Sequence, residues 1–239
     1  MTTMKTRKYR NEWKYVCGDA DIISICEKLK AILPGDVHGK DGRYNIHSLY
    51  FDDYRDTCAY ETDAGLGSRY KYRIRYYGDD PGLLRLERKE KLYGRCYKKS
   101  CRITGDEYRD IIDGEYAKLL YETDDPVLRQ FCVCAMTRRF TPKVIIDYER
   151  TAYVEPITNI RITADRNISA SGDVERFLDG EYMRTPVMQK GQHVLEVKFD
   201  YILPRHVRSI VARDNLVQTS FSKYYLGRKI LNKFGAPAI

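Results

Sequence analysis

Charged and apolar residues alternate strictly along part of this chain. In residues 69–76, Arg69, Lys71, Arg73 and Arg75 take the odd positions, and tyrosine or isoleucine takes each even position. Because successive side chains of a β-strand point to opposite faces, this alternation predicts a strand with one wholly basic face. The same period predicts about eight strands, over Lys8–Val16, Tyr44–Phe51, Tyr70–Tyr77, Leu83–Tyr93, Arg95–Ile103, Lys143–Tyr153, Ile157–Ile168 and Val194–Phe199.

Helical patterns interrupt these strands. Asp19 and Asp21 are candidate N-caps of a helix that ends before Pro34, and Asp125-Pro126 begins a second helix through about Met136. A third helix is predicted over about Ser220–Phe234. No internal repeat and no linker rich in Pro, Gly or Ser divides the chain, so residues 1–239 are expected to form one domain. The predicted fold class is α+β, mainly antiparallel β.

Charged side chains share one face in several other predicted strands. In the strand after the basic one, Arg85, Glu87, Lys89 and Lys91 lie opposite leucines. A solvated face explains one such strand, but the repeated Arg-x-Arg and Glu-x-Lys pairs indicate charged faces that converge. Two cations about 6 Å apart repel by roughly 2.8 kcal/mol at an effective dielectric of about 20. Converging basic faces therefore favour a bound polyanion.

Composition agrees with an anionic ligand without identifying it. The 239 residues include 42 Lys and Arg against 34 Asp and Glu, a net charge of +8 that also suits a nucleic-acid binder. No apolar run is long enough to cross a membrane and the start of the chain lacks a signal peptide, so we expect a cytoplasmic protein. The seven cysteines lack paired Cys-x-x-Cys spacing and are expected to be reduced thiols. No P-loop motif occurs.

A series of short motifs covers nearly the whole chain, in the order RNEWKY (10–15), SLYFD (48–52), YRIRY (72–76), LERKEK (86–91), DYERTAY (147–153), RITAD (161–165), LEVK (195–198) and Ser222-Lys223. Together these motifs resemble the polyphosphate polymerase domain of the vacuolar transporter chaperone (VTC) family, a branch of the CYTH-like triphosphate tunnel metalloenzymes. The resemblance implies a closed tunnel barrel of about eight strands, with flanking helices and a C-terminal helix.

The resemblance also implies roles for individual residues. Glu196 matches the carboxylate that binds the divalent ion, Mn²⁺ or Mg²⁺. Glu12 and Glu87 either bind metal as well or orient neighbouring Lys and Arg side chains, and the second role is favoured. Catalytic contacts to phosphate are expected from Lys14, Arg73, Arg75, Lys89 and Lys198. Further phosphate contacts are expected from Lys91 (which shares the charged face), Lys98 or its neighbour Lys99, Arg150, Arg161, Ser222 and Lys223.

The expected function is transfer of the terminal phosphoryl group of a nucleoside triphosphate to a growing inorganic polyphosphate chain. A metal-dependent tripolyphosphatase or nucleoside triphosphatase is the alternative, and a polyphosphate- or RNA-binding module without turnover is the second. Nucleic acid is the weaker expectation, because the tyrosines alternate to the face opposite the cations. Fungal relatives add an inositol-phosphate-sensing module and a membrane segment that this sequence lacks, so we expect a free-standing catalytic domain.

Overall fold

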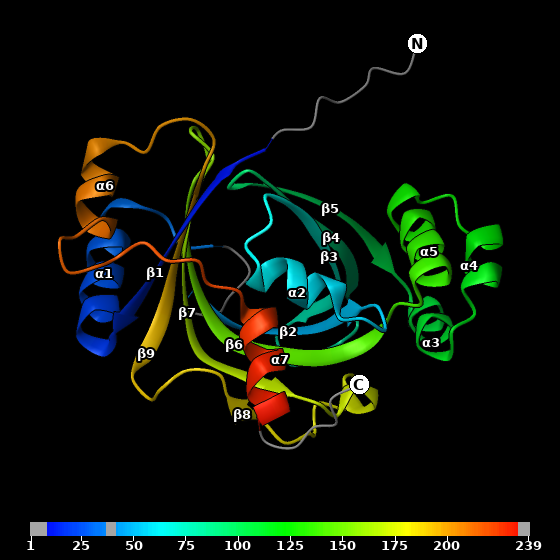
Figure 1. Ribbon diagram of the computed structural model, residues 1–239. Helices are drawn as coiled ribbons and strands as arrows, with labels where there is room; N and C mark the ends of the chain where they lie inside the picture. The colour runs from blue at the N-terminus through cyan, green and yellow to red at the C-terminus, as the bar shows by residue number, and fades with distance from the viewer. Residues whose placement is uncertain (1–8, 37–41, 234–239) are drawn as a thin grey trace, which may run out of the picture.

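One strongly curled antiparallel sheet dominates the computed structural model, which describes residues 9–36 and 42–233 (Figure 1). The strands follow the order β1-β9-β7-β6-β2-β3-β4-β5, and the short β8 pairs with β7. The bounds are β1 Asn11–Gly18, β2 Arg43–Asp52, β3 Ser68–Tyr77, β4 Leu84–Leu92, β5 Arg95–Ile103, β6 Thr141–Glu155, β7 Ile160–Ser171, β8 Thr185–Pro186 and β9 Gln192–Phe199.

Two hydrogen bonds join the outermost strands of this sheet. The backbone N–H of Arg10 donates to the carbonyl of Cys96, and the N–H of Cys96 donates to the carbonyl of Arg10, each at 2.9 Å. Arg10 immediately precedes β1, and Cys96 lies in β5. The predicted tunnel architecture is therefore confirmed, with one refinement: the sheet curls until its edges touch at this bridge, and no continuous ladder closes the barrel within the described residues.

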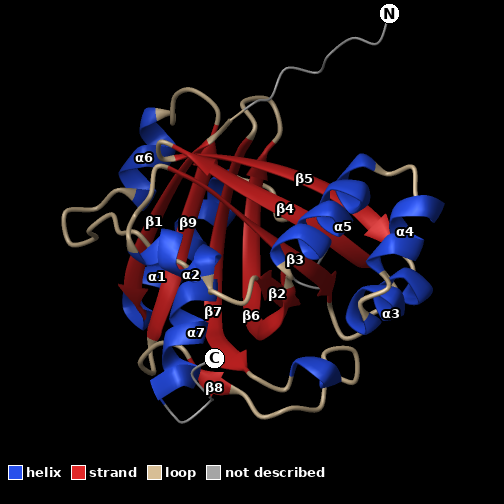
Figure 2. Ribbon diagram, turned by 45° about the vertical axis from the view of Figure 1, so that its right-hand side comes forward, coloured by secondary structure: helices blue, strands red, loops and turns tan. Residues whose placement is uncertain are grey.

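Much of the hydrophobic core lies outside the curl. On one side, Tyr72 and Phe131 pack edge to face beneath the helices that cover β3, β4 and β5. On the other side, Ile22, Val197 and Val207 belong to a second cluster, beneath α1 and α6 (Figure 2). The helices are α1 Asp19–Ile32, α2 Thr57–Asp63, α3 Gly105–Asp113, α4 Tyr116–Glu122, α5 Pro126–Arg138, α6 Arg205–Val211 and α7 Lys223–Lys233, with a 3₁₀ turn at Val174–Arg176.

Helix α7 packs on the inner face of the sheet. A Cβ on Gly227 would meet Ile146 Cδ1 at 2.4 Å and Ala170 Cβ at 3.2 Å, so the missing side chain allows the helix to approach β6 and β7. Ile146 is two residues before Tyr148 in β6, so its side chain points to the same face of the sheet, the face that lines the cavity described below. The C-terminal helix thus occupies one end of the curl (Figure 1).

The predicted strands and the three predicted helices are present, with ends that differ by a few residues. The predicted strand start at Lys8 and helix end at Phe234 lie outside the described residues. One helix start was wrong: Gly18 occupies the N-cap of α1 without a side-chain hydrogen bond, and Asp19 and Asp21 lie in the first turn. Asp125 does cap α5, accepting from Val127 N at 2.7 Å.

Four helices, α2, α3, α4 and α6, and the two-residue β8 were not predicted. A signal for α3 was present, since Thr104 and Glu107 form a capping box. All seven cysteines are free thiols, as predicted. Within the described residues, no helix combines the length and the apolar character needed to cross a bilayer.

Candidate active site inside the curled sheet

The inner face of the sheet surrounds a cavity with two compartments. The narrow compartment, of about 140 Å³, is bounded by residues 219–224 at the start of α7. The wide compartment, of about 590 Å³, opens past Tyr77, Leu83 and Tyr97. Both compartments share a charged middle region, which we call the junction, lined by Glu12, Arg73, Arg75, Lys89, Cys96, Arg150 and Lys198.

The structure brings nearly all of the predicted site residues to this cavity. Lys14, Lys91, Glu196, Ser222 and Lys223 line the narrow compartment. Lys98 and Arg161 line the wide one. Lys99 pairs with Arg88 in the register of β4 and β5, so it points to the opposite face, and Lys98 is the lumen-facing residue of that pair.

Strands β3, β4 and β5 form a wall of cations. Lys71 lies directly opposite Lys89, which lies directly opposite Lys98. Arg75 likewise lies opposite Arg85. Like charges directly across an antiparallel pair destabilise the sheet. Two glutamates offset part of this repulsion, since Glu87 contacts Lys98 and Glu12 contacts Lys89. The predicted basic face of residues 69–75 is confirmed, and it points into the cavity.

Glu87 lies beneath this wall and does not line the cavity. Its Oε2 accepts from Arg73 Nε at 2.7 Å, and its Oε1 accepts from Lys98 Nζ at 2.7 Å. Burial alone would raise the pKa of Glu87, but the charges of Arg73, Arg75 and Lys98 outweigh it and hold the pKa well below its usual range. With both oxygens occupied, Glu87 is suited to orient Arg73 and Lys98.

Strands β1 and β9 carry the acidic side of the junction. Glu12 pairs across the strands with Lys198, and Lys14 pairs with Glu196. The Glu12 carboxylate accepts from Lys89 Nζ at 2.7 and 2.9 Å, which ties the acidic side to the cationic wall. Lys14 Nζ lies 3.7 Å from an oxygen of each glutamate. Burial alone would raise the pKa of Glu196, but the charges of Lys198, Lys14 and Lys89 outweigh it and hold the pKa well below its usual range, so the carboxylate remains ionised.

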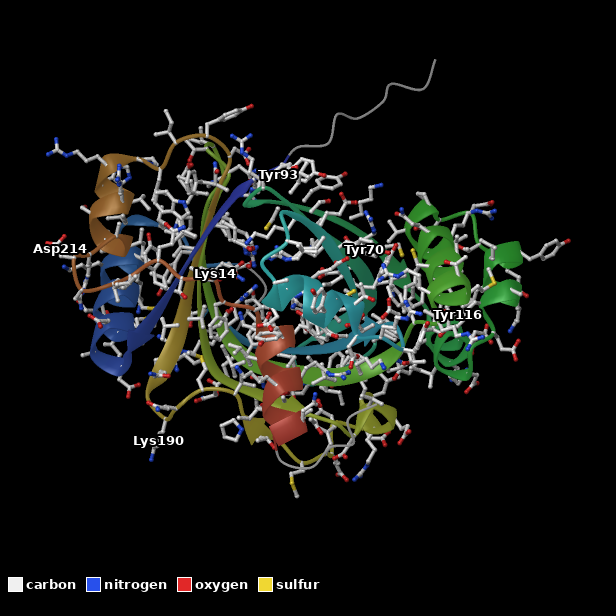
Figure 3. The ribbon with its side chains drawn as sticks, in the orientation of Figure 1. Lys14, Tyr70, Tyr93, Tyr116, Lys190 and Asp214 are labelled. Carbon is white, nitrogen blue, oxygen red and sulfur yellow. The ribbon has the colours of Figure 1, made fainter. Side chains whose placement is uncertain are left out.

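Glu12 and Glu196 line the cavity, so their carboxylates are the candidate hard oxygen donors for a divalent cation. Among the described residues, no group of three His, Cys, Asp or Glu side chains is placed to hold a metal. Mg²⁺ is commonly held by one or two carboxylates together with substrate phosphates and water. Two glutamates beside a row of Lys and Arg side chains therefore fit a metal ion that is coordinated partly by the protein and partly by a bound phosphate. Figure 3 labels Lys14, which lies on β1.

A buried acid organises the end of the cavity near α7. Asp165 is fully buried, and its carboxylate accepts from Arg150 and from Lys223 Nζ, the latter at 2.6 Å. Burial would raise the pKa of Asp165, but these two cations lower it to about 2. Asp165 therefore joins β6, β7 and the first residue of α7 in one charged unit.

Several residues that contact these cations were not assigned from the sequence. Tyr50 OH accepts from Arg73 at 2.7 Å, and Tyr148 OH accepts from Arg75 at 2.9 Å. Lys71 also lines the narrow compartment. Its signal was visible in the alternation with Arg73, whereas the tyrosines could not be separated from core tyrosines by their pattern.

The model of the VTC domain matches residues 9–232. The search of curated proteins found no match. Among solved structures, a putative adenylyl cyclase from Hippeastrum, described as having a dominant triphosphatase activity, aligns with a TM-score of 0.56 at 12% identity, over 93% of this chain and 95% of that one.

A putative adenylate cyclase from Bacillus halodurans aligns with a TM-score of 0.49 at 10% identity, over 95% of this chain and 90% of its own. At 12% identity the Hippeastrum match supports the fold alone. The family match covers nearly the whole described chain and agrees with the motifs recognised in the sequence. The chain therefore belongs to the VTC domain family and shares the fold of the Hippeastrum protein.

Proposed function

We propose that this protein is a metal-dependent polyphosphate polymerase. The observation that carries the proposal is the junction, a group of cations with two flanking glutamates between two compartments of the same cavity. A donor phosphate and an acceptor phosphate would meet there from opposite sides. Phosphoryl transfer depends mainly on alignment and on neutralisation of charge, which Arg and Lys side chains supply.

In the proposed reaction, a terminal oxygen of the polyphosphate chain attacks the γ-phosphorus of a nucleoside triphosphate. The bond from that phosphorus to the β–γ bridging oxygen breaks, and the nucleoside diphosphate leaves with this oxygen. Arg73 and Arg75 would bind the transferred group. Glu87 holds the Arg73 guanidinium in position for this contact. Glu196 and Glu12 would hold Mg²⁺ or Mn²⁺, which would neutralise phosphate charge.

The wide compartment suits the nucleoside end of the donor. Tyr77, Leu83 and Tyr97 line it, and its volume of about 590 Å³ leaves more room for a base and a sugar than the 140 Å³ of the narrow compartment. Arg161 also lines this compartment, where its guanidinium donates to Tyr44 OH at 2.9 Å. A base needs apolar and aromatic contact, whereas a bare phosphate chain needs only cations. The donor nucleotide is therefore assigned to the wide side and the acceptor chain to the α7 side.

Incubation of the purified protein with ATP and Mn²⁺ tests this function directly. A gel ladder that stains with toluidine blue supports synthesis. Orthophosphate without a ladder would assign the protein as a triphosphatase, the alternative chemistry of such a site. ATP binding without turnover would instead support a polyanion-binding module. Glu196→Gln is the matched variant, and a polymerase should lose ladder formation with this change.

A further inference from the structure

The thiol of Cys96 lies in the junction, at the point where the two edges of the sheet meet (Figure 1). Its side chain lines both compartments, although the residue is only 8% exposed. Its backbone forms the bridge to Arg10, which is two residues before Glu12 on the opposite edge. Because alternate residues of a strand share a face, Arg10 and Glu12 both line the cavity. The bridge that joins the edges therefore places a sulfur beside a candidate metal ligand.

The thiol of Cys96 donates a hydrogen bond to the carboxylate of Glu12. Its Sγ lies 3.2 Å from Glu12 Oε2. Lys89 donates to both oxygens of the same carboxylate, so the acid is ionised and can only accept. The hydrogen between sulfur and oxygen therefore belongs to the thiol. Glu12 is thus held across the seam by one residue of β4 and one residue of β5.

These hydrogen bonds use the two carboxylate oxygens of Glu12 unequally. Oε2 accepts from Cys96 and, at 2.9 Å, from Lys89, and these two bonds occupy both of its lone pairs. Oε1 accepts from Lys89 at 2.7 Å, while the amine of Lys198 lies 3.6 Å away, beyond hydrogen-bond distance. Oε1 therefore keeps a lone pair that a metal ion can use, and Oε2 does not.

The oxygen that the thiol leaves open is the one that faces Glu196. The amine of Lys198 lies 3.6 Å from Glu12 Oε1 and also contacts Glu196 Oε1. One cationic group thus lies between the Oε1 atoms of the two glutamates. A divalent ion shared by both carboxylates needs the same two oxygens to point toward each other, so the orientation of Glu12 decides whether the pair can bind it.

We propose that Cys96 is a positioning residue for the metal site: its thiol holds Glu12 by Oε2, so that Oε1 faces Glu196 and a shared divalent ion. The inference rests on the metal requirement of the proposed function and deepens it, because it names the group that orients one of the two ligands. Loss of a hydrogen-bond partner behind a metal ligand typically weakens metal binding by about 10- to 100-fold. A thiol is a weak donor, so the lower end of this range is expected.

Calorimetric titration with an ATP analogue, in which NH replaces the β–γ bridging oxygen, tests this role without turnover. Each protein is titrated once in EDTA and once with saturating Mn²⁺, and the ratio of the two affinities measures the contribution of the metal. Cys96→Ala should lower this ratio by about tenfold. Its affinity in EDTA should stay within about twofold of the parent, because the thiol holds a metal ligand and not a phosphate.

Two further variants separate the hydrogen bond from the packing of the side chain. Cys96→Ser keeps a donor at the same position and should recover most of the ratio that Cys96→Ala loses. Cys101→Ala is the matched control, since Cys101 lies on the same strand and is equally buried, at 7% exposure, but belongs to the core on the opposite face. Its ratio should equal that of the parent.

Three results would overturn the positioning role of Cys96. A parent-like ratio in Cys96→Ala would show that the thiol does not orient Glu12, and equal losses in EDTA and in Mn²⁺ would show that it only supports the packing of the seam. Both results would leave the polymerase assignment intact, because the gel ladder tests that assignment separately. A parent protein whose affinity does not increase with Mn²⁺ would overturn the metal site and the metal dependence of the proposed function together.

Discussion

Arg150 donates two hydrogen bonds to the carboxylate of Asp165, at 2.6 and 2.8 Å, within the wall of the cavity. Lys223 shares the same carboxylate. Asp165→Asn would leave two buried cations without their acid, and breaking a buried pair in this way costs about 3–5 kcal/mol. Urea unfolding of the variant should show a loss in that range.

The control for this change is Asp214→Asn, since Asp214 is exposed on the loop after α6 (Figure 3). It should unfold within about 0.5 kcal/mol of the parent. Tripolyphosphate should stabilise Asp165→Asn more than it stabilises the parent, because the ligand replaces the missing negative charge. A loss below about 1 kcal/mol for Asp165→Asn would contradict the charged unit described for this end of the cavity.

Substitutions of Glu196 and Glu87 should have different effects on the metal dependence of activity. Glu196→Gln is expected to raise the Mn²⁺ concentration needed for half-maximal activity by at least about tenfold, because it removes one of two available donors. Glu87→Gln should leave that concentration nearly unchanged and weaken tripolyphosphate binding in EDTA, because Arg73 and Lys98 lose their anchor. Identical metal dependence of the two variants would show that the acids have been assigned incorrectly.

Sequence alternation predicted the lumen-facing side of the strands well. The basic residues of β3 lie on one face because a strand has a fixed period of two, and this holds whatever the remainder of the fold does. The same rule separated Lys98 from Lys99 once the register with Arg88 was known. Local periodicity was therefore enough to find the cavity wall.

The pairing of acids with bases could not be predicted from the sequence. Lys89 and Glu12 are 77 residues apart, and they meet because the sheet curls until β1 approaches β4 and β5. Lys71 likewise meets Ser222, 151 residues away in the sequence, because of the curl and the position of α7. The importance of Gly227 could not be predicted from the sequence either, because it depends on the close contact of this residue with β6 and β7.

Stability should depend on pH through Lys71. Burial lowers the folded-state pKa of the amine to about 7, below its ordinary value of 10.5, so the unfolded chain binds more protons between these two values. The contribution of this group to the free energy of unfolding therefore increases as the pH rises from about 7 toward 10.5. Urea unfolding at pH 7 and pH 9.5 should show a gain in the parent that is smaller in Lys71→Met. The same change in both proteins would mean that Lys71 titrates normally.

Gly227→Ala should move α7 away from the sheet. The new methyl group would lie 2.4 Å from Ile146 Cδ1, so either the helix or β6 must shift. Replacing glycine in a helix normally gains about 1 kcal/mol, but here the overpacking should cost about 1–3 kcal/mol and displace Ser222 and Lys223. Tripolyphosphate affinity should fall in this variant.

Asn232→Ala is the comparison for the α7 variant, because Asn232 is exposed on the same helix. Calorimetric titration should find its tripolyphosphate affinity unchanged. Parent-like affinity in Gly227→Ala as well would mean that the position of α7 does not matter for phosphate binding.

The most direct test of the polymerase assignment is a ³¹P NMR time course of the protein with ATP and Mg²⁺. We predict that resonances of internal chain phosphates grow as ADP accumulates, with no matching increase in orthophosphate. Orthophosphate that increases in step with ADP, without chain resonances, would contradict the assignment and identify the protein as a triphosphatase.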